Sequence, residues 1–226
     1  MSVAVSTIAA DAAELLLDTG YDRWDQDFHL ESANEAERQA VILKPDVYVV
    51  TSSFQLVQGP KQSLPTTAIQ LERITRNRGV AGSTDGAEIT LINRDDLAAV
   101  RPDWHADTYE STTVEHYMHD EKDPLTFWIY PAQTSSPYYV EAIYAAYPTP
   151  ITAIGNNINL ADIYRDLIKH YMVFRAHALD AANSQFSAQR AVQAWNLFVT
   201  MLERKDLVER AYSPKLRNAA NGNSNQ

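Results

Sequence analysis

The strongest candidate for metal chemistry is a short run of histidine and aspartate in the middle of the chain. His116 and His119 are separated by two residues, and Asp120 follows directly. His105 lies nearby in the sequence. Imidazole and carboxylate groups are common ligands of Zn²⁺ and related ions. On a strand, however, His116 and His119 point to opposite faces. We therefore expect no metal site, and a metal-dependent hydrolase centred on His116, His119 and Asp120 is the third of three functions considered.

Other residues with catalytic potential lack the partners that catalysis needs. No Gly-x-Ser-x-Gly motif occurs, and the absence of cysteine removes the thiolate nucleophile. The glycine-rich segment 79–86 lacks the Lys-Ser/Thr ending of a phosphate-binding loop, and the charge of Asp85 would repel a phosphate. Asp95 and Asp96 are adjacent, so helix capping explains them better than acid–base chemistry. We expect no enzyme activity and no cofactor.

The composition is that of an ordinary globular protein. The 226 residues are 45% hydrophobic and 21% charged, and none is cysteine, which excludes a disulfide framework. No apolar run approaches the roughly 20 residues that cross a bilayer, so no membrane contact is expected. The opening residues lack a basic flank and a continuous apolar stretch, so a secretory signal is not expected either.

The net charge of −10 is distributed unevenly. Residues 1–37 hold nine carboxylates and one cation, Arg23, whereas residues 203–226 hold five cations and three carboxylates. Affinity for nucleic acid comes chiefly from cations that neutralise phosphate, so the acidic half is a poor DNA-gripping surface. A solvated acidic helix face and a solubilising tail explain the same pattern.

Four segments carry apolar residues at the three-to-four spacing of a helix face, namely 6–17, 32–43, 160–178 and 188–202. Gly20 is expected to end the first helix. Ser32 and Glu35 form a capping-box pattern that predicts the start of the second helix. Asn159 predicts the N-cap of the third.

Aromatic and histidine side chains near these helices are expected to pack inside the protein. Trp24 and Phe28, in the connector between the first two helices, are predicted core residues. His170 and His177 lie seven residues apart on one helix face, where we expect a core or interface role rather than metal binding.

The middle of the chain changes to a strand-like pattern. Short runs rich in β-branched and aromatic residues, separated by Gly, Pro or Asp, predict six strands at 47–51, 69–74, 88–92, 113–117, 125–130 and 139–144. A short helix is expected at 95–100, with Asp95 as its cap. The glycines of 79–86 predict an exposed loop.

These elements predict an α+β fold. We expect an antiparallel bundle of four main helices from both chain ends, an inserted antiparallel β-rich region and an extended C-terminal tail. The expected divisions are helices at 1–46, the β-rich insertion at 47–150, a helical hairpin at 151–210 and the tail at 211–226. The tail is too polar to offset its own ordering entropy, so a neighbouring molecule is expected to hold it.

Several segments, taken in order, resemble a known family. They are KPDVY (44–48), GPKQSLP (59–65), ITRN (74–77), NRDDL (93–97), RPDW (101–104) and DPLTFWIYP (123–131). Their order and spacing resemble the head-to-tail adaptor, or connector, proteins of tailed bacteriophages, of the tail-tubular-protein-A type. The resemblance covers about residues 30–205.

The resemblance implies a structural virion protein at the head–tail interface. It implies a ring, expected to hold twelve copies, that joins the portal protein to a tail nozzle or tail tube protein after assembly in the host cytoplasm. DNA would pass through this ring without sequence-specific binding, and the acidic N-terminal segment could line the channel. The expected portal-binding residues are Arg204, Lys205, Arg210, Lys215, Leu216 and Arg217.

The alternative is a carbohydrate- or ligand-binding module. In this reading the β-rich region presents Trp104, Trp128 and several tyrosines as a stacking surface. The tyrosines concerned are Tyr138, Tyr139, Tyr144 and Tyr147. A ring on the portal favours the adaptor, and a sugar-binding monomer favours the module.

Overall fold

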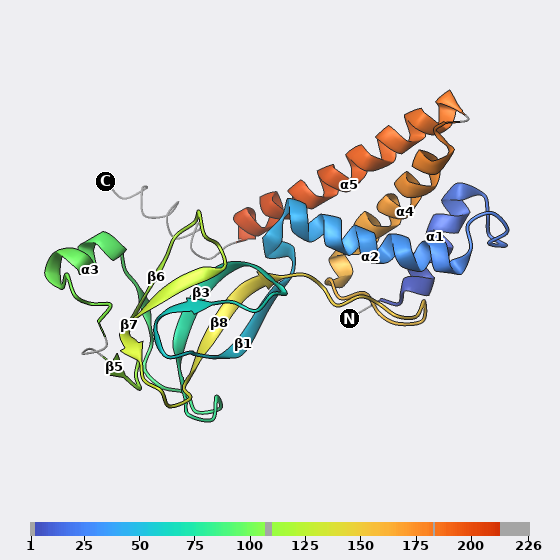
Figure 1. Ribbon diagram of the computed structural model, residues 1–226. Helices are drawn as coiled ribbons and strands as arrows, with labels where there is room; N and C mark the ends of the chain where they lie inside the picture. The colour runs from blue at the N-terminus through green and yellow to red at the C-terminus, as the bar shows by residue number, and fades with distance from the viewer. Residues whose placement is uncertain (1–2, 107–109, 183, 213–226) are drawn as a thin grey trace. The chain divides into compact units, whose positions relative to one another are not determined.

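The computed structural model describes residues 3–106, 110–182 and 184–212, with side chains as far as Glu203. Its residues group into two compact units (Figure 1). The helical unit joins both ends of the chain, Met1–Lys44 and Pro148–Gln226, and the β unit is Pro45–Tyr147. The expected α+β class is confirmed. The finer division at residues 46, 150 and 210 stays a prediction.

Helix α1 (Val5–Leu16) starts without a side-chain cap. Its buried stripe consists of Val5, Ile8, Ala9, Ala12 and Ala13. The first amides of a helix have no partner within it. Here the N–H groups of Val5 and Ser6 donate to the carbonyls of Asn156 and Ile154, at 2.9 and 2.8 Å. The start of α1 is therefore fixed by a segment that lies far away in the sequence.

The end of α1 differs from the expectation. Leu17 adopts the left-handed conformation with φ of 58°, and its N–H bonds to the carbonyl of Glu14. This conformation closes a helix in the way that glycine usually does. The prediction that Gly20 ends the helix is wrong, because Leu17 reverses the chain three residues earlier.

Helix α2 (Gln26–Leu43) begins before the predicted capping box. The carboxylate of Asp25 accepts a hydrogen bond from the N–H of Phe28 at 2.8 Å and so caps the helix. Ser32 lies inside the helix, is buried, and donates its hydroxyl proton to the carbonyl of Phe28 at 2.7 Å. The predicted capping box is wrong because Asp25 caps the helix about two turns earlier.

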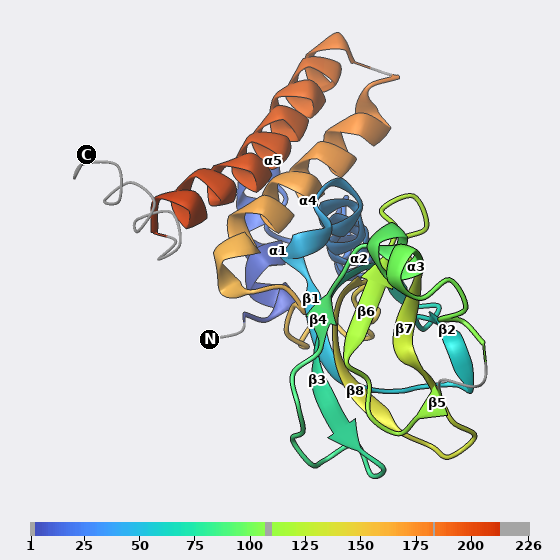
Figure 2. The same cartoon turned by 90° about the vertical axis from the view of Figure 1, so that its left-hand side faces the viewer.

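Helices α4 (Arg165–Asp180) and α5 (Gln185–Tyr212) form an antiparallel hairpin and lie side by side in both views (Figures 1 and 2). A cluster of aromatic rings joins them, with ring centroids 5.1 to 6.5 Å apart, made by Tyr171, Phe174, Trp195 and Phe198. Helix α4 also contacts α1 and α2. It is therefore the central helix of this unit, and the detailed four-helix bundle stays a prediction.

The β unit contains two sheets. The first has the order β1-β8-β3 and is antiparallel. The second has the order β2-β7-β6-β4, with β5 also paired to β7 (Figure 2). The strands are β1 (Val49–Gln55), β2 (Gly59–Ser63), β3 (Ala68–Gly79), β4 (Thr90–Leu91), β5 (Glu110–Ser111), β6 (His116–His119), β7 (Thr126–Gln133) and β8 (Tyr139–Ala146).

Strands β2 and β5 were not predicted, and two strand pairs are parallel where antiparallel pairing was expected. Strand β2 begins with Gly59 and Pro60, which read as a turn, and β5 has only two residues. The pairs β4–β6 and β5–β7 are parallel. The expected all-antiparallel insertion is therefore wrong at these two short strands, because each returns to its sheet through a connection rather than a hairpin.

The core of the β unit lies between its sheets. It contains Leu71 and Ile74 of β3, Phe127 and Ile129 of β7, and Val140 of β8. A buried side chain ties two loops to this core. Asn77 accepts a hydrogen bond from the N–H of Val114 at 2.9 Å and donates to the carbonyls of Val114 and Ala87 at 2.8 and 3.0 Å. All polar atoms of its amide group are thus satisfied.

Candidate functional site

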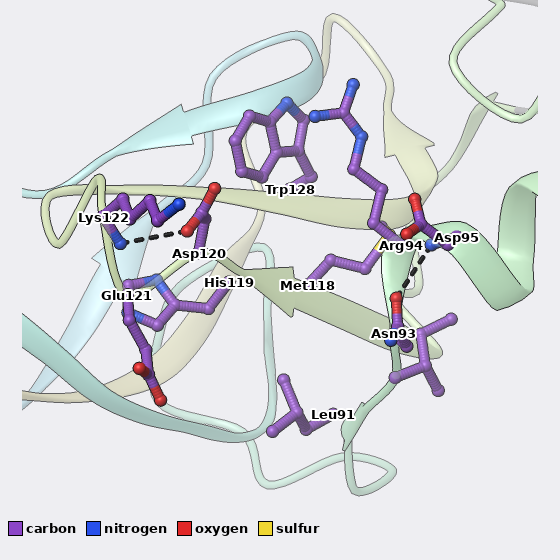
Figure 3. A pocket seen from close by; sticks show the side chains of 11 residues that line it. Leu91, Asn93, Arg94, Asp95, Met118, His119, Asp120, Glu121, Lys122 and Trp128 are labelled. Atoms are coloured by element: carbon purple, nitrogen blue, oxygen red, sulfur yellow. Dashed lines mark hydrogen bonds between the residues drawn. The ribbon is translucent and has the colours of Figure 1, made fainter.

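The β unit carries a surface pocket of about 730 Å³ beside helix α3 (Arg94–Val100), shown in Figure 3. Segments 91–95 and 118–122 line it together with Trp128 of β7. Its charged side chains have both signs: Arg94, Lys122, Asp95, Asp120 and Glu121. The opposing charges leave no field of one sign that would collect a charged ligand.

Helix α3 is held on the sheet by aromatic contacts. Asn93 caps it by accepting a hydrogen bond from the N–H of Asp95 at 2.9 Å, so the prediction that Asp95 is the cap is wrong by two residues. The Arg94 guanidinium lies 4.9 Å from the ring centre of Trp128 and 5.9 Å from that of Trp104. These distances fit cation–π contacts that fix the start of the helix.

The two tryptophans of the alternative stacking surface do not present open rings. Trp104 is only 3% exposed, and Tyr144 is 8% exposed. Trp128 is half-buried, and Arg94 lies over its ring (Figure 3). A sugar ring needs an open aromatic face to stack on. Trp104, Trp128 and Tyr144 are therefore engaged in packing the protein, whereas Tyr147 is exposed.

The histidines considered for metal binding are held by separate partners. His116 Nδ1 lies 2.6 Å from the Thr90 hydroxyl, and His119 Nδ1 lies 3.2 Å from the carbonyl of Thr126. Within the described residues, no three His, Cys, Asp or Glu side chains are placed to hold a metal ion. The structure does not bring His116, His119 and Asp120 together as a ligand set.

His170 and His177 both lie half-buried on α4. Burial lowers the pKa of each below its ordinary value of 6.5, with smaller electrostatic effects from neighbouring charges. A lowered pKa favours the neutral imidazole, which suits packing in a helix interface. The expectation of a core or interface role remains a prediction.

The helical unit contains a buried carboxylate that the sequence analysis did not single out. Glu37 of α2 is 1% exposed. One carboxylate oxygen accepts from the backbone N–H groups of Asn159 and Leu160 at 2.6 and 3.1 Å, and the other accepts from the Asn159 side chain at 2.7 Å. The prediction that Asn159 caps the third helix is wrong, because α4 begins at Arg165 and the Asn159 side chain donates to Glu37.

Burial raises the pKa of Glu37 above its ordinary value of 4.5, and the three hydrogen bonds oppose this rise. One turn earlier on α2, the Asn34 side chain donates to the carbonyl of Ile151 at 3.0 Å and accepts from its N–H at 2.7 Å. These two residues tie the irregular segment 151–160 to α2. The segment in turn supports the start of α1.

A second buried polar group lies near the start of α2. His29 is fully buried between the rings of Tyr21 and Phe28, each 5.5 Å away, and neither of its ring nitrogens has a hydrogen-bond partner among the described residues. Burial lowers its pKa below 6.5, while attraction to Asp18 and Asp25 acts in the opposite direction.

Many carboxylates of the acidic N-terminal segment have structural partners. Asp11 pairs with Arg165 of α4 at 2.6 Å. Glu31 and Glu35 flank Arg175 of α4 at 3.4 and 3.2 Å. These contacts join α1 and α2 to the central helix. These three carboxylates of the acidic segment therefore serve the packing of the helical unit.

The structure describes only half of the expected portal-binding set, and only at the level of the backbone. Arg204, Lys205 and Arg210 belong to the last part of α5. Lys215, Leu216 and Arg217, with most of the expected tail 211–226, lie outside the described residues. The two residues of that tail that are described, Ala211 and Tyr212, continue the helix.

The described residues thus form an α+β fold with a helical unit and a β unit. A model of the SU10 adaptor protein family matches residues 3–219, which span both units. The chain belongs to the SU10 adaptor protein family. It is a structural adaptor of the phage virion, and the resemblance drawn from the sequence is confirmed. A search of curated proteins gives no match.

No helix in the described part of the chain is both long and apolar enough to span a lipid bilayer.

Proposed function

We propose that copies of this chain form a ring between the portal protein and the tail, and that DNA passes through the ring. The family match over residues 3–219 is the observation that carries this proposal. The net charge of −10 supports the passage of DNA, since a negative surface repels phosphate and does not retain the genome. The ring is proposed to hold twelve copies and to assemble in the host cytoplasm.

The length of α5 supports a portal contact at its C-terminal end. Helix α5 has 28 residues and α4 has 16. At about 1.5 Å per residue, α5 is roughly 18 Å longer than its antiparallel partner. The additional length falls at the end of α5, where Arg204, Lys205 and Arg210 lie. This end of α5 thus extends beyond the length of α4.

The remaining cations of the proposed portal contact, Lys215 and Arg217, follow shortly after the helix. Leu216 between them would add an apolar contact. Binding to the portal would offset the loss of chain entropy on docking. The tail nozzle or tail tube protein is the proposed partner on the other side of the ring.

The test is the mass of complexes formed with purified portal protein. We expect the full chain to form a ring on the portal, and the triple variant Arg204→Glu, Lys205→Glu, Arg210→Glu to bind at least about tenfold more weakly, because charge-assisted contacts are reversed. Arg190→Glu is the matched control, since Arg190 is an exposed cation on the same helix. Equal loss in the control, or a chain that stays monomeric beside the portal, would contradict the proposal.

A further inference from the structure

Strand β1 forms one edge of its sheet, and β8 lies between it and β3 (Figure 1). None of the described strands pairs with the other side of β1. The strand has seven residues, VVTSSFQ, and none of them is charged or proline. Long, uncharged edge strands are rare in isolated proteins because they invite pairing with another chain.

The hydrogen bonds at both ends of β1 show which backbone groups face outward. The N–H of Ala146 donates to the carbonyl of Tyr48, and the N–H of Leu56 donates to the carbonyl of Tyr138. In an antiparallel pair, every second residue bonds to the same neighbour. Val50, Ser52 and Phe54 therefore bond to β8. The N–H and C=O groups of the alternate residues face the open edge: Val49, Thr51, Ser53 and Gln55.

The other strand edges of the β unit are protected. Along β3, the N–H of Asn77 donates to the carbonyl of Ala87, and the N–H of Ile89 donates to the carbonyl of Thr75, so the segment 87–89 covers part of this edge. The strand also carries charged side chains, which discourage pairing. Strand β2 contains a proline and a lysine, which discourage another strand from pairing with an edge. Strand β4 has only two residues. Strand β1 has none of these protections.

The face of β1 that contacts the core is also incompletely covered. Val50 and Phe54 pack against the buried cluster of the β unit but remain half-buried. The ring of Phe54 lies 5.8 Å from that of Phe127, which is fully buried. An additional strand beside β1 would extend the sheet over these side chains. The edge therefore offers apolar contact as well as backbone hydrogen bonds.

We propose that β1 accepts a strand from a neighbouring copy of this chain within the assembled ring. The inference rests on the proposed ring. It is favoured by charge, because copies that each carry −10 repel one another least where the accepting surface presents no carboxylate. Residues 47–60 contain no charged side chain and surround the open edge.

Hydrogen exchange tests this proposal without any mutation. In the free protein, the amides of Val49, Thr51, Ser53 and Gln55 should exchange quickly. In the ring on the portal they should slow by roughly tenfold or more, since strand pairing protects them. The amides of Val50, Ser52 and Phe54 are the internal control, because they already bond to β8. A ring in which the outward amides still exchange quickly would overturn the inference and leave the ring itself intact.

A single substitution tests the same edge in assembly. Thr51→Pro removes one outward N–H and none of the bonds to β8, and edge strands accept proline at such positions. We expect the variant to fold as a monomer and to form rings with at least about tenfold lower affinity. Thr51→Val keeps the N–H and is the control. Unchanged ring formation by a folded Thr51→Pro protein would contradict the proposal.

Crosslinking can identify the chain that pairs with β1. Because the protein has no cysteine, one introduced cysteine gives a single site for the crosslinker. A Thr51→Cys protein carries one thiol, placed at the edge, for attachment of a short crosslinker in the assembled particle. Crosslinked peptides from another copy of this chain are expected. Crosslinks to a different virion protein, or a β1-paired dimer without the portal, would overturn the assignment of the partner. Absence of any ring would remove the proposed function and this inference together.

Discussion

The two units fix their irregular segments in chemically different ways. In the helical unit, the carboxylate of Glu37 holds Asn159 and Leu160. In the β unit, the neutral amide of Asn77 holds Val114 and Ala87. Both side chains are 1% exposed. The comparison shows that a buried connection between distant segments can use a charged or a neutral group, and only the charged one makes stability depend on pH.

The difference follows from the groups that need a partner. Glu37 faces three N–H donors and no acceptor, so two acceptor oxygens satisfy all of them. Asn77 faces two carbonyls and one N–H, so it must donate as well as accept. A carboxylate would therefore fail at position 77.

The largest loss of stability is expected when a charged side chain replaces the buried amide of the β unit. Asn77→Asp would bring a carboxylate against the carbonyls of Val114 and Ala87, and we expect a loss of about 4 kcal/mol in the free energy of unfolding at neutral pH. Denaturant titration measures it. Asn93→Asp is the control, because Asn93 is an exposed helix cap and aspartate caps equally well. A loss below about 1 kcal/mol would show that the buried amide is replaceable.

The next effect concerns the carboxylate itself. Glu37→Ala leaves the two backbone N–H groups of Asn159 and Leu160 buried without an acceptor, and we expect a loss of about 3 kcal/mol. Glu37→Gln keeps one acceptor oxygen and should lose clearly less. Hydrogen exchange should show faster opening of 151–160 in the alanine variant. If both variants unfold like the parent protein, the segment is held by Asn34 and other contacts alone.

The smallest effect is on how stability depends on pH, where Glu37 and His29 of the helical unit act in opposite directions. The folded pKa of Glu37 is raised, so the folded state holds the proton more strongly, and stability falls as pH rises from 4.5 through the folded pKa. The folded pKa of His29 is lowered, so stability falls as pH drops below 6.5.

The measurement is the free energy of unfolding against pH for the parent protein and two variants. Glu37→Gln should remove the decline that begins above pH 4.5, and His29→Phe should reduce the decline below pH 6.5. Neither variant should alter exchange within β3 and β8. Identical pH profiles for all three proteins would show that these groups titrate alike in the folded and unfolded chain.

The helix stripes were predictable from the sequence because their burial follows a regular period. The apolar spacing in 6–17, 160–178 and 188–202 corresponds to α1, α4 and α5. Helix ends were less predictable, since Leu17 and Asp25 act through backbone conformation and local geometry that several residues could supply. Strand β2 was missed because Gly59 and Pro60 favour a turn, and pairing with β7 overrides that preference.

The position of Glu37 in the sequence of α2 indicates a buried carboxylate. Ala33, Ala36, Ala40 and Val41 form the buried stripe of α2, and Glu37 lies on the same face. A carboxylate at such a position needs a partner. The partner could not be named from the sequence, because Asn159 is more than a hundred residues away. The stacking of Arg94 on two tryptophans was hidden for the same reason.

The way in which the chain enters and leaves the β unit has a modular consequence. The unit is inserted between the helices, and its first and last strands, β1 and β8, are direct neighbours. The N–H of Ala146 donates to the carbonyl of Tyr48 at 3.2 Å, close to the first and last residues of the unit. The chain therefore enters and leaves the β unit at neighbouring positions. Replacing or shortening this unit would leave the order of the helices unchanged.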